Sequence, residues 1–361
     1  MTAKPSVELL RSISDEHVLR SLLAERKLTR AELAVLTGLS KPTVSDSVRR
    51  LTENGLVADT GERTPGGRGK GRVGSFYALA EDVGSALVVD IGAGGVVAEL
   101  VNVYGDVVAR ELVEIESPAD VPAALPVAAA AVADPALGGH VRLAVVSAAD
   151  PVDRHTGRLV QLPDSPFLTG ELDPVRVLRP FVRGPVVVDN DVNWAARAEQ
   201  ASGDYLYLYL GEGLGGALVN DGEVRRGFSG LAGELAHVHT IGPDGRAVPF
   251  IEVFGLLGLR KPRTTAIDVD RLLAADNHAL AWIADAVIGV ATTLISVLDP
   301  ELIVLGGSWG GRLTPLFEAA ALVMPRRVPF VAAKVADAPI TGARTDAVDR
   351  LQTAVIAASR G

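Results

Sequence analysis

The stretch LTRAELAVLTGLSKPTVSDSVRRL, residues 28–51, encodes two short helices with a turn between them. Thr29 and Glu32 form a capping-box pattern, in which each side chain can satisfy a free amide at the start of the first helix. Gly38 suits the left-handed residue that ends this helix, and Ser40, followed closely by a proline, begins the second helix. Two short helices around such a turn are typical of a helix-turn-helix.

The second helix has one apolar stripe, formed by Val44, Val48 and Leu51, so its other side chains are expected to face outward. Small hydroxylated side chains and arginines on an exposed helix face can reach phosphates and base edges in a major groove. We therefore predict that this helix contacts DNA through Ser40, Thr43, Ser45, Asp46, Ser47, Arg49 and Arg50.

A β-wing is expected next, with strands at residues 56–59 and 75–79 and a glycine-rich loop between them. Arg68, Lys70 and Arg72 in this loop suit phosphates or a narrow minor groove. A helical hairpin could explain the two helices alone, and a solvated linker could explain the loop alone. The order helix, helix, wing at a basic N-terminus favours a DNA-binding head.

Charge is distributed unevenly along the 361 residues, although the net charge is −9. Residues 1–80 carry 13 Lys and Arg against 9 Asp and Glu, whereas the remainder carries 22 against 35. A basic head on an acidic body is expected when one domain alone meets DNA. The absence of cysteine excludes disulfides and thiolate metal sites. No secretory segment or membrane span is apparent in the sequence, so we predict a cytoplasmic protein without membrane contact.

The rest of the chain alternates short apolar strands with helices, starting with the run at residues 86–91. The same alternation begins again at residues 205–210, which suggests two α/β lobes with a ligand-binding cleft between them. The expected domains are a winged head at 1–80, a first lobe at 81–190 and a second lobe at 191–344, with a C-terminal helix at 345–361 returning to the first lobe.

The most informative segment of the body is VDNDVN, residues 188–193, where a strand ends in a carboxamide and a carboxylate. Asn190 and Asp191 can bind the vicinal hydroxyls of a sugar. Alternatively, polar side chains here, including Asp191 or Asn193, can cap the next helix. Trp194 could stack on a sugar, but we expect it to fill the core.

This arrangement resembles the ROK family of repressors and sugar kinases over almost the whole chain, head included. The resemblance implies an α/β fold, with a winged helix-turn-helix followed by a two-lobed actin-like ATPase body. In the family's kinases, the residue at the position of Asp191 is the general base. The segment GELAH, residues 233–237, matches the family's Gly-Glu-x-x-His, and Glu252 matches the acid after its cysteine cluster. The resemblance therefore implies a sugar-binding ring, formed by Asn190, Asp191, Glu234, His237 and Glu252.

Without the resemblance, surface glutamates and a core histidine would explain the last three residues of this ring. The family's zinc site is also altered, because residues 242–249 stand where its cysteines would be. His239 and Asp244 lie nearby but are a weak basis for zinc. We predict no metal and no cofactor, and a loop held by packing of Pro249, Phe250 and Phe254.

The two phosphate-binding loops of the family are degenerate here. The first reads DIGAGG, residues 90–95, and lacks the family's threonine and lysine. The second reads GEGLGG, residues 211–216, and has Glu212 at the usual threonine position. A carboxylate beside a phosphate is repulsive, and phosphoryl transfer depends on positioning and charge neutralisation. We therefore predict no phosphotransfer, with degenerate nucleotide loops at Gly92, Gly94, Gly211, Glu212 and Gly213.

The leading hypothesis is a DNA-binding transcription regulator, a repressor, whose catalytically degenerate body senses a sugar or sugar derivative. Its expected partners are double-stranded operator DNA, a sugar effector and further copies of the chain in a homodimer or homotetramer. One alternative is an active ATP-dependent sugar kinase with a fused DNA-binding domain. Another is a DNA-binding protein whose vestigial body serves only for oligomerisation, which a thermal-shift screen against sugars would test.

Overall fold

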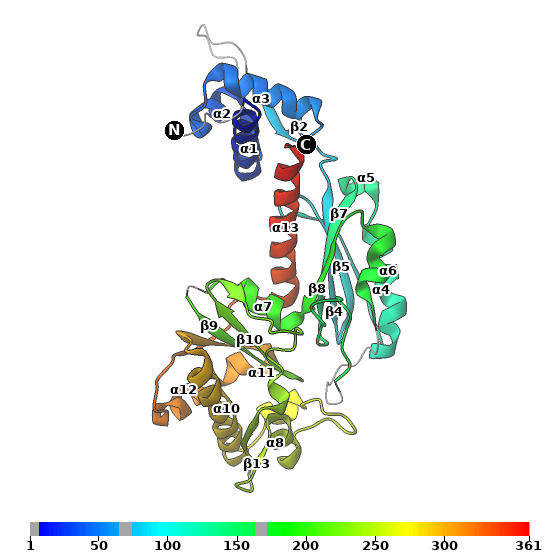
Figure 1. The fold of residues 1–361 in the computed structure, drawn as a ribbon. Helices are drawn as coiled ribbons and strands as arrows, with labels where there is room; N and C mark the ends of the chain where they lie inside the picture. Colours follow the sequence, from blue (N-terminus) through cyan, green and yellow to red (C-terminus); the bar gives the residue numbers. More distant parts are fainter. Residues whose placement is uncertain (1–6, 65–73, 163–171, 202, 361) are drawn as a thin grey trace.

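The computed structural model describes residues 7–64, 74–162, 172–201 and 203–360, and has an N-terminal head above an α/β body (Figure 1). The head contains α1 (Val7–Glu25), β1 (Lys27–Thr29), α2 (Arg30–Thr37), α3 (Lys41–Glu53), β2 (Val57–Arg63) and β3 (Ser75–Leu79). Its strands form an antiparallel sheet in the order β1-β3-β2.

The helix ends of the head lie where their side chains predict. The predicted capping box is present. The Glu32 amide donates to the Thr29 hydroxyl, and the Thr29 amide donates to the Glu32 carboxylate. Gly38 has a φ of 69° and ends α2, and the Ser40 hydroxyl accepts a hydrogen bond from the Thr43 amide at 3.3 Å. The predicted helix-turn-helix boundaries are confirmed. The stripe Val44, Val48 and Leu51 is fully buried, as expected.

Two five-stranded sheets and one two-stranded sheet lie in the described part of the body. The first part of the body contains β4 (Ser85–Gly92), β5 (Gly95–Val101), β6 (Val107–Val113), α4 (Val121–Val132), α5 (Pro135–Gly138), β7 (Val141–Ala148), α6 (Pro174–Leu178) and β8 (Val186–Asn190). It is followed by α7 (Asp191–Glu199), β9 (Tyr205–Leu210), β10 (Leu214–Asn220), β11 (Glu223–Val224), β12 (His239–Ile241), β13 (Ala247–Pro249) and α8 (Phe250–Leu256). The chain ends with α9 (Val269–Leu273), α10 (Asn277–Leu298), β14 (Leu302–Gly306), α11 (Gly307–Gly310), α12 (Thr314–Ala320), β15 (Phe330–Ala332) and α13 (Ala338–Ala358).

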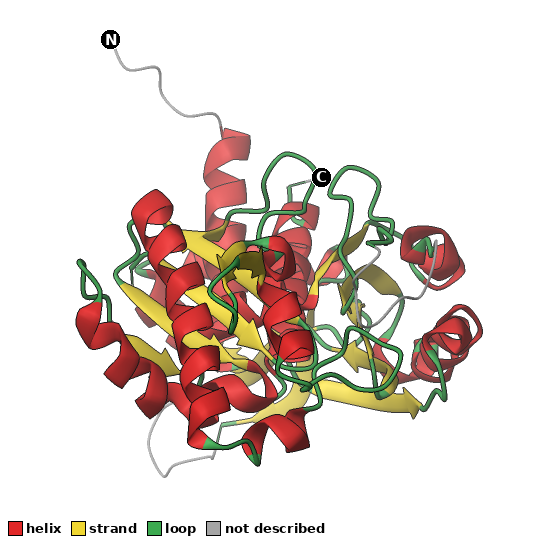
Figure 2. Cartoon of the chain, turned by 90° about the horizontal axis from the view of Figure 1, so that it is seen from below, coloured by secondary structure: helices red, strands yellow, loops and turns green. Residues whose placement is uncertain are grey.

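The two large sheets have the same topology. Their orders are β6-β5-β4-β7-β8 and β11-β10-β9-β14-β15. In each sheet the first three strands pair antiparallel and the last three pair parallel. We call the part built on β4 the first lobe and the part built on β9 the second lobe. Figure 2 views these strands from below, with helices packed around them.

Each lobe has its own hydrophobic core. In the first lobe, α4 packs against β5 and β6, and its buried side chains join those of β4 and β7. In the second lobe, α10 lies in a core shared with α8, α12, β9 and β14. By length and composition α10 is apolar enough to cross a membrane, but core helices meet the same criteria, and Ile283, Val287 and Val290 of α10 are buried in the protein.

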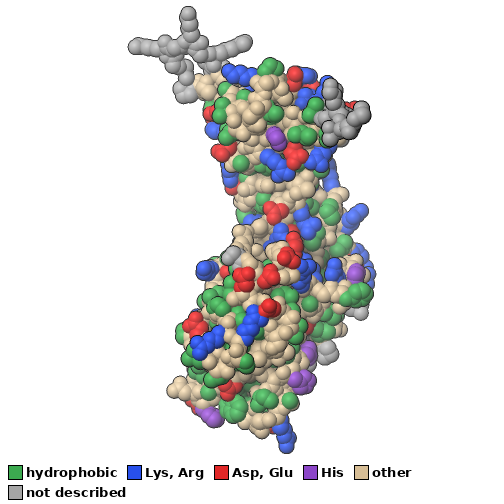
Figure 3. All heavy atoms as spheres, turned by 60° about the vertical axis from the view of Figure 1, so that its left-hand side comes forward, with side chains coloured by type: hydrophobic (Ala, Val, Ile, Leu, Met, Phe, Trp, Pro, Cys, Tyr) green, Lys and Arg blue, Asp and Glu red, His purple; other side chains and the backbone are tan. Residues whose placement is uncertain are grey.

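Helix α13 connects the body with the head (Figure 1). It packs against β4, β7 and α7, and its Arg344 binds the fully buried Glu99 of β5 at 2.8 Å. Just after its end, Arg360 Nη2 donates to Glu16 of α1 at 2.7 Å. In addition, buried side chains of α1, α13 and β4 belong to one hydrophobic cluster. Figure 3 shows charged side chains of both signs interspersed from the head to the middle of the body.

Candidate functional site

A cavity of about 520 Å³ lies between the two lobes. Its lining brings together nine chain segments, and includes Asp90, Gly92, Gly94, Asn190, Asp191, Glu212, Gly213, Glu234 and His237. These residues are among those that the sequence predicted for sugar binding and for the degenerate nucleotide loops. Gly211 is not in the lining, and its carbonyl accepts a hydrogen bond from Trp309 at 2.8 Å. A second cavity, of about 790 Å³, lies where head and body meet and contains none of the predicted sugar residues.

The start of α7 presents two of the predicted sugar residues to the cavity. Asn190 is the N-cap of this helix, because its Oδ1 accepts a hydrogen bond from the Val192 amide at 3.0 Å. Neither Asp191 nor Asn193 has that role. The Asn190 Nδ2 lies 3.3 Å from the Asp150 carbonyl, so the side chain is held while it lines the cavity.

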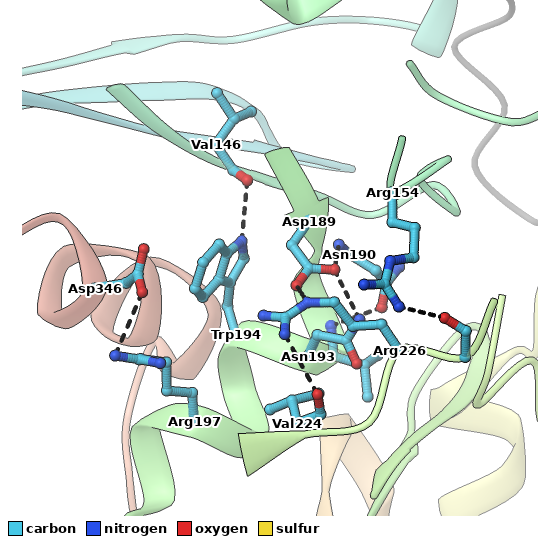
Figure 4. A network of polar contacts seen from close by, with 12 residues as sticks. Val146, Arg154, Asp189, Asn190, Asn193, Trp194, Arg197, Val224, Arg226 and Asp346 are labelled. Atoms are coloured by element: carbon cyan, nitrogen blue, oxygen red, sulfur yellow. Dashed lines mark hydrogen bonds and ion pairs between the residues drawn. The ribbon is translucent and has the colours of Figure 1, made fainter. Parts of the chain in front are cut away.

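Trp194, one turn into α7, belongs to the core. It is 1% exposed, and its Nε1 donates to the Val146 carbonyl at 2.9 Å (Figure 4). The expectation that Trp194 fills the core, in preference to stacking on a sugar, is confirmed.

The carboxyl groups of the cavity have altered acidity. Burial raises the pKa of Asp191 to about 8, and the nearby Asp90 carboxylate adds to the rise. Burial also raises the pKa of Glu234 to about 7, with a further contribution from Asp150. Near neutral pH these groups are therefore partly protonated, and each can donate as well as accept a hydrogen bond. This pairing of donors and acceptors matches the hydroxyl groups of a sugar.

Glu234 reaches the cavity through a close backbone approach. Gly233 has a φ of 100°, and a Cβ atom there would collide with the Gly216 carbonyl oxygen. Only glycine fits this position without strain. His237, three residues after Glu234, ends a short 3-10 helix and also lines the cavity.

Glu252 does not join the sugar-binding ring, so this part of the prediction is wrong. Its side chain is 49% exposed, and its Oε1 lies 3.0 Å from Nη2 of Arg260. The neighbouring Ile251 lines the cavity in its place. Helix α8 directs the Glu252 side chain outward, away from the cavity. There its carboxylate, which the resemblance assigned to a sugar, is paired with the guanidinium of Arg260.

The prediction that Glu212 repels a phosphate also needs correction. Lys261 Nζ lies 2.5 Å from Glu212 Oε1, so the carboxylate is paired at the cavity rim. Pairing reduces the like-charge penalty, because the two charges nearly cancel at a distance. The argument against nucleotide binding therefore rests on the first loop, where Ala93 and Gly94 form the turn between β4 and β5.

The loop that replaces the family's zinc site is packed against the core of the second lobe. Phe250 and Phe254 are buried, and the Phe254 ring lies 5.7 Å from that of Trp309. The predicted packing is confirmed for these two phenylalanines, whereas Pro249 is only partly buried. Within the described ranges no group of three His, Asp or Glu side chains could hold a metal ion. The absence of a metal stays a prediction.

The predicted DNA-contacting face of α3 is smaller than the sequence suggested. Ser47 is fully buried and its hydroxyl donates to Asp15 of α1, so the prediction that Ser47 faces outward is wrong. Arg50 Nη2 donates to the same carboxylate at 2.6 Å. Asp46 and Arg49 are exposed, as expected. The other predicted contacts on this helix lie at least partly at the surface, namely Ser40, Thr43 and Ser45.

The three cations of the wing loop, Arg68, Lys70 and Arg72, lie outside the described residues. The wing strands themselves are observed as β2 and β3, which pair antiparallel. The contacts of the head with DNA therefore remain predictions that rest on its fold and on its exposed side chains.

The ROK family profile matches residues 86–248, and a profile for winged helix-turn-helix DNA-binding domains matches residues 11–58. Residues 86–248 therefore form a ROK family domain. A xylose repressor from Caldicellulosiruptor bescii is 24% identical over 341 residues, which cover 82% of this chain and 84% of the repressor. The chain therefore carries a winged helix-turn-helix head in front of this domain, as predicted from residues 28–79.

Solved structures with the same fold include a regulator and a kinase. A ROK family transcriptional regulator, a homologue of the E. coli MLC protein, matches 96% of this chain and 99% of its own with a TM-score of 0.60 and 16% identity. A ROK hexokinase from Thermus thermophilus matches 74% of this chain and 99% of its own with a TM-score of 0.56 and 22% identity. The predicted α/β fold, a winged head followed by a sugar-kinase-like body, is confirmed.

Sequence reasoning missed three residues that hold the predicted ones in place: Asp15, Arg226 and Lys261. Each forms an ion pair with a residue at least 35 positions away, namely Arg50, Asp189 and Glu212. Asp189 stands in the quoted motif, so its carboxylate was visible. No local sequence pattern identifies Asp15, Arg226 or Lys261 as the partner of one of these residues.

Proposed function

We propose that this chain is a DNA-binding transcription repressor whose body binds a sugar or sugar derivative next to Asp191 and does not transfer phosphate. The observation that carries the proposal is the chemistry of the interlobe cavity. Carboxyl, carboxamide and imidazole groups line it, whereas its described lining residues include no lysine or arginine. Such a lining suits hydroxyl groups and lacks the cation that neutralises a transferred phosphoryl group.

The charge of the lining also favours an effector without an anionic group. Asp90, Asp191, Glu212 and Glu234 all line the cavity, and of these four Glu212 alone forms an ion pair within the described part of the chain. A phosphate ester or a uronic acid would find no lysine or arginine in this described lining, and its charge would oppose the ionised fraction of these carboxyls. Unmodified sugars are therefore the first effectors to test.

The head and the cavity are connected through contiguous structure. Pro339 at the start of α13 lines the cavity, and Arg360 after its end binds Glu16 in the head. Sugar binding that closes the lobes would change how two heads are spaced in a dimer, and a dimer must fit both half-sites at once. A coupling of about 1–3 kcal/mol changes operator affinity roughly 5- to 150-fold.

Two measurements test the proposal. In a thermal-shift screen, an unmodified monosaccharide should stabilise the protein, and the same sugar should release operator DNA. Glu234→Ala should keep operator binding and lose the response to sugar. Loss of operator binding in this variant would indicate that Glu234 has a structural role.

The second candidate is an active sugar kinase, and two observations favour it. Asp191 occupies the position of the family's general base, and Lys261 brings a cation to the rim of the cavity through Glu212. Sugar-dependent ATP turnover separates the candidates. A robust rate that Asp191→Asn abolishes would replace the repressor proposal with the kinase.

A further inference from the structure

Asp189 is the hub of a polar network (Figure 4), and its neighbour Asn190 lines the cavity. It is 6% exposed and lies near the end of β8 in the first lobe. Its Oδ1 accepts hydrogen bonds from the Asn190 amide at 2.9 Å and from Asn193 Nδ2 at 2.8 Å. The carboxylate therefore fixes the turn that leads into α7. Both donors are neutral, so they leave the buried charge itself without compensation.

The charge partner of Asp189 comes from the other lobe. Nε of Arg226 donates to Asp189 Oδ2, and Nη1 of Arg226 donates to the Val224 carbonyl at 3.3 Å (Figure 4). Val224 ends β11, the edge strand of the second-lobe sheet. The Arg226 side chain is mostly buried, with 29% of it exposed. The ion pair thus joins the lobes beside the cavity.

A second set of contacts closes the same junction. Arg154, in the segment after β7, donates from Nη1 to the Gly227 carbonyl at 2.6 Å and from its backbone amide to the Ser229 carbonyl at 2.9 Å. The segment that follows Arg226 is therefore held by the first lobe along its length. This segment leads directly to Gly233 and Glu234, which line the cavity.

We propose that Arg226 is a positioning residue: by binding Asp189 across the lobes, it holds Asn190 and Asp191 opposite Glu234 in the geometry that the effector recognises. This inference rests on the proposed function. The Asp191 carboxyl lies at the start of α7, directly after β8 of the first lobe. The Glu234 carboxyl lies at the end of the segment that follows Arg226 in the second lobe. Removing Arg226 would leave a buried carboxylate without a cation, and the turn would rearrange to expose it to water.

Amide hydrogen exchange on the full chain without ligand tests the positioning directly. Arg226→Gln should increase the exchange of residues 190–193 and leave the head unchanged. The matched control is Arg225→Gln, because Arg225 is a half-exposed neighbour whose bonds, to Asp221 at 3.1 Å and to Asn220, stay within the second lobe. Unchanged exchange in Arg226→Gln would overturn the proposal.

A conservative variant separates positioning from a general loss of folding. Arg226→Lys keeps the charge but not the planar fork, so its exchange should fall between wild type and Arg226→Gln. If Arg226→Gln does not fold, Arg226→Lys is compared with Arg225→Lys. Equal exchange in those two variants would count against the proposal.

Calorimetry with D-xylose and D-glucose as probes tests the consequence for recognition. Where wild type binds either sugar, Arg226→Gln should weaken binding about 10- to 100-fold, a range taken from residues that orient metal-binding side chains. Its operator affinity without sugar should be unchanged. Wild-type sugar affinity in Arg226→Gln would overturn the inference. If wild type binds neither probe, the proposed function is in doubt for these sugars, and the exchange measurement still decides the role of Arg226.

Discussion

Replacing Asp191 by asparagine should stabilise the ligand-free protein at alkaline pH. Burial and the Asp90 charge raise the pKa of Asp191 from 3.8 to about 8 on folding. Below pH 4 the group is protonated in both the folded and the unfolded chain and does not oppose folding. Between pH 4 and pH 8 the unfolded chain ionises while the folded chain does not, so the free energy of unfolding falls as pH rises.

The size of this effect follows from the two pKa values. At about 1.4 kcal/mol for each pH unit between them, the upper limit is about 5 kcal/mol at pH 8. Local relaxation and water entry reduce such penalties in real sites. We therefore expect the stabilisation by Asp191→Asn to be about 2–4 kcal/mol larger at pH 8 than at pH 5. The amide retains the oxygen that accepts the Val192 amide at 2.8 Å.

Denaturant unfolding followed by tryptophan fluorescence is a suitable assay, because Trp194 is buried one turn after Asp191. The matched control is Asp285→Asn, since Asp285 is exposed on α10 and should give the same small change at both pH values. The same Asp191→Asn variant should lose sugar binding, which is the trade-off expected of a site that strains the fold. Equal stability of wild type and Asp191→Asn at pH 8 would refute the reasoning.

Three further predictions concern the head and the corrected site. Neutralising Arg68, Lys70 and Arg72 together should reduce the salt dependence of operator affinity by about three units, one for each lost phosphate contact, whereas an unchanged slope would exclude the wing from the interface. Asp15→Ala should destabilise the head by about 2–3 kcal/mol, because it leaves two donors of α3 without their buried acceptor, and hydrogen exchange in α3 should increase accordingly. Glu252→Gln should leave sugar affinity within about twofold by calorimetry, since an exposed pair contributes little; a tenfold loss would return Glu252 to the binding site.

Much of the fold could be predicted because its signals are local. Thr29 and Glu32 are three residues apart, and the chain between them is one helical turn, so their mutual hydrogen bonds follow from sequence spacing. The strand at residues 205–210 alternates within six residues and was predicted at its observed bounds. The repeated topology of the two lobes likewise follows from a pattern that occurs twice along the chain.

The errors have a common physical origin. Ser47 was assigned to DNA as a polar side chain expected to face outward, and Glu252 was assigned to a sugar because it matches the acid of the family's motif. Glu212 was treated as an unpaired charge at the position of the family's threonine. None of these assignments could take a distant partner into account. In the structure each has an internal partner: Asp15, Arg260 and Lys261. Sequence patterns therefore assign too many polar residues to external ligands. Such a residue can instead form a hydrogen bond or an ion pair with a distant segment of the same chain.

The same reasoning strengthens the assignment of the residues that remain. Asp191 and Glu234 lie in the cavity with pKa values that burial and neighbouring acids raise, so their surroundings favour the neutral over the charged form. A fold would gain stability by replacing such groups with uncharged ones. Two carboxyls are kept in one cavity at a cost in stability, and they come from chain segments joined by the Asp189–Arg226 pair. A ligand that hydrogen-bonds to both explains this arrangement best.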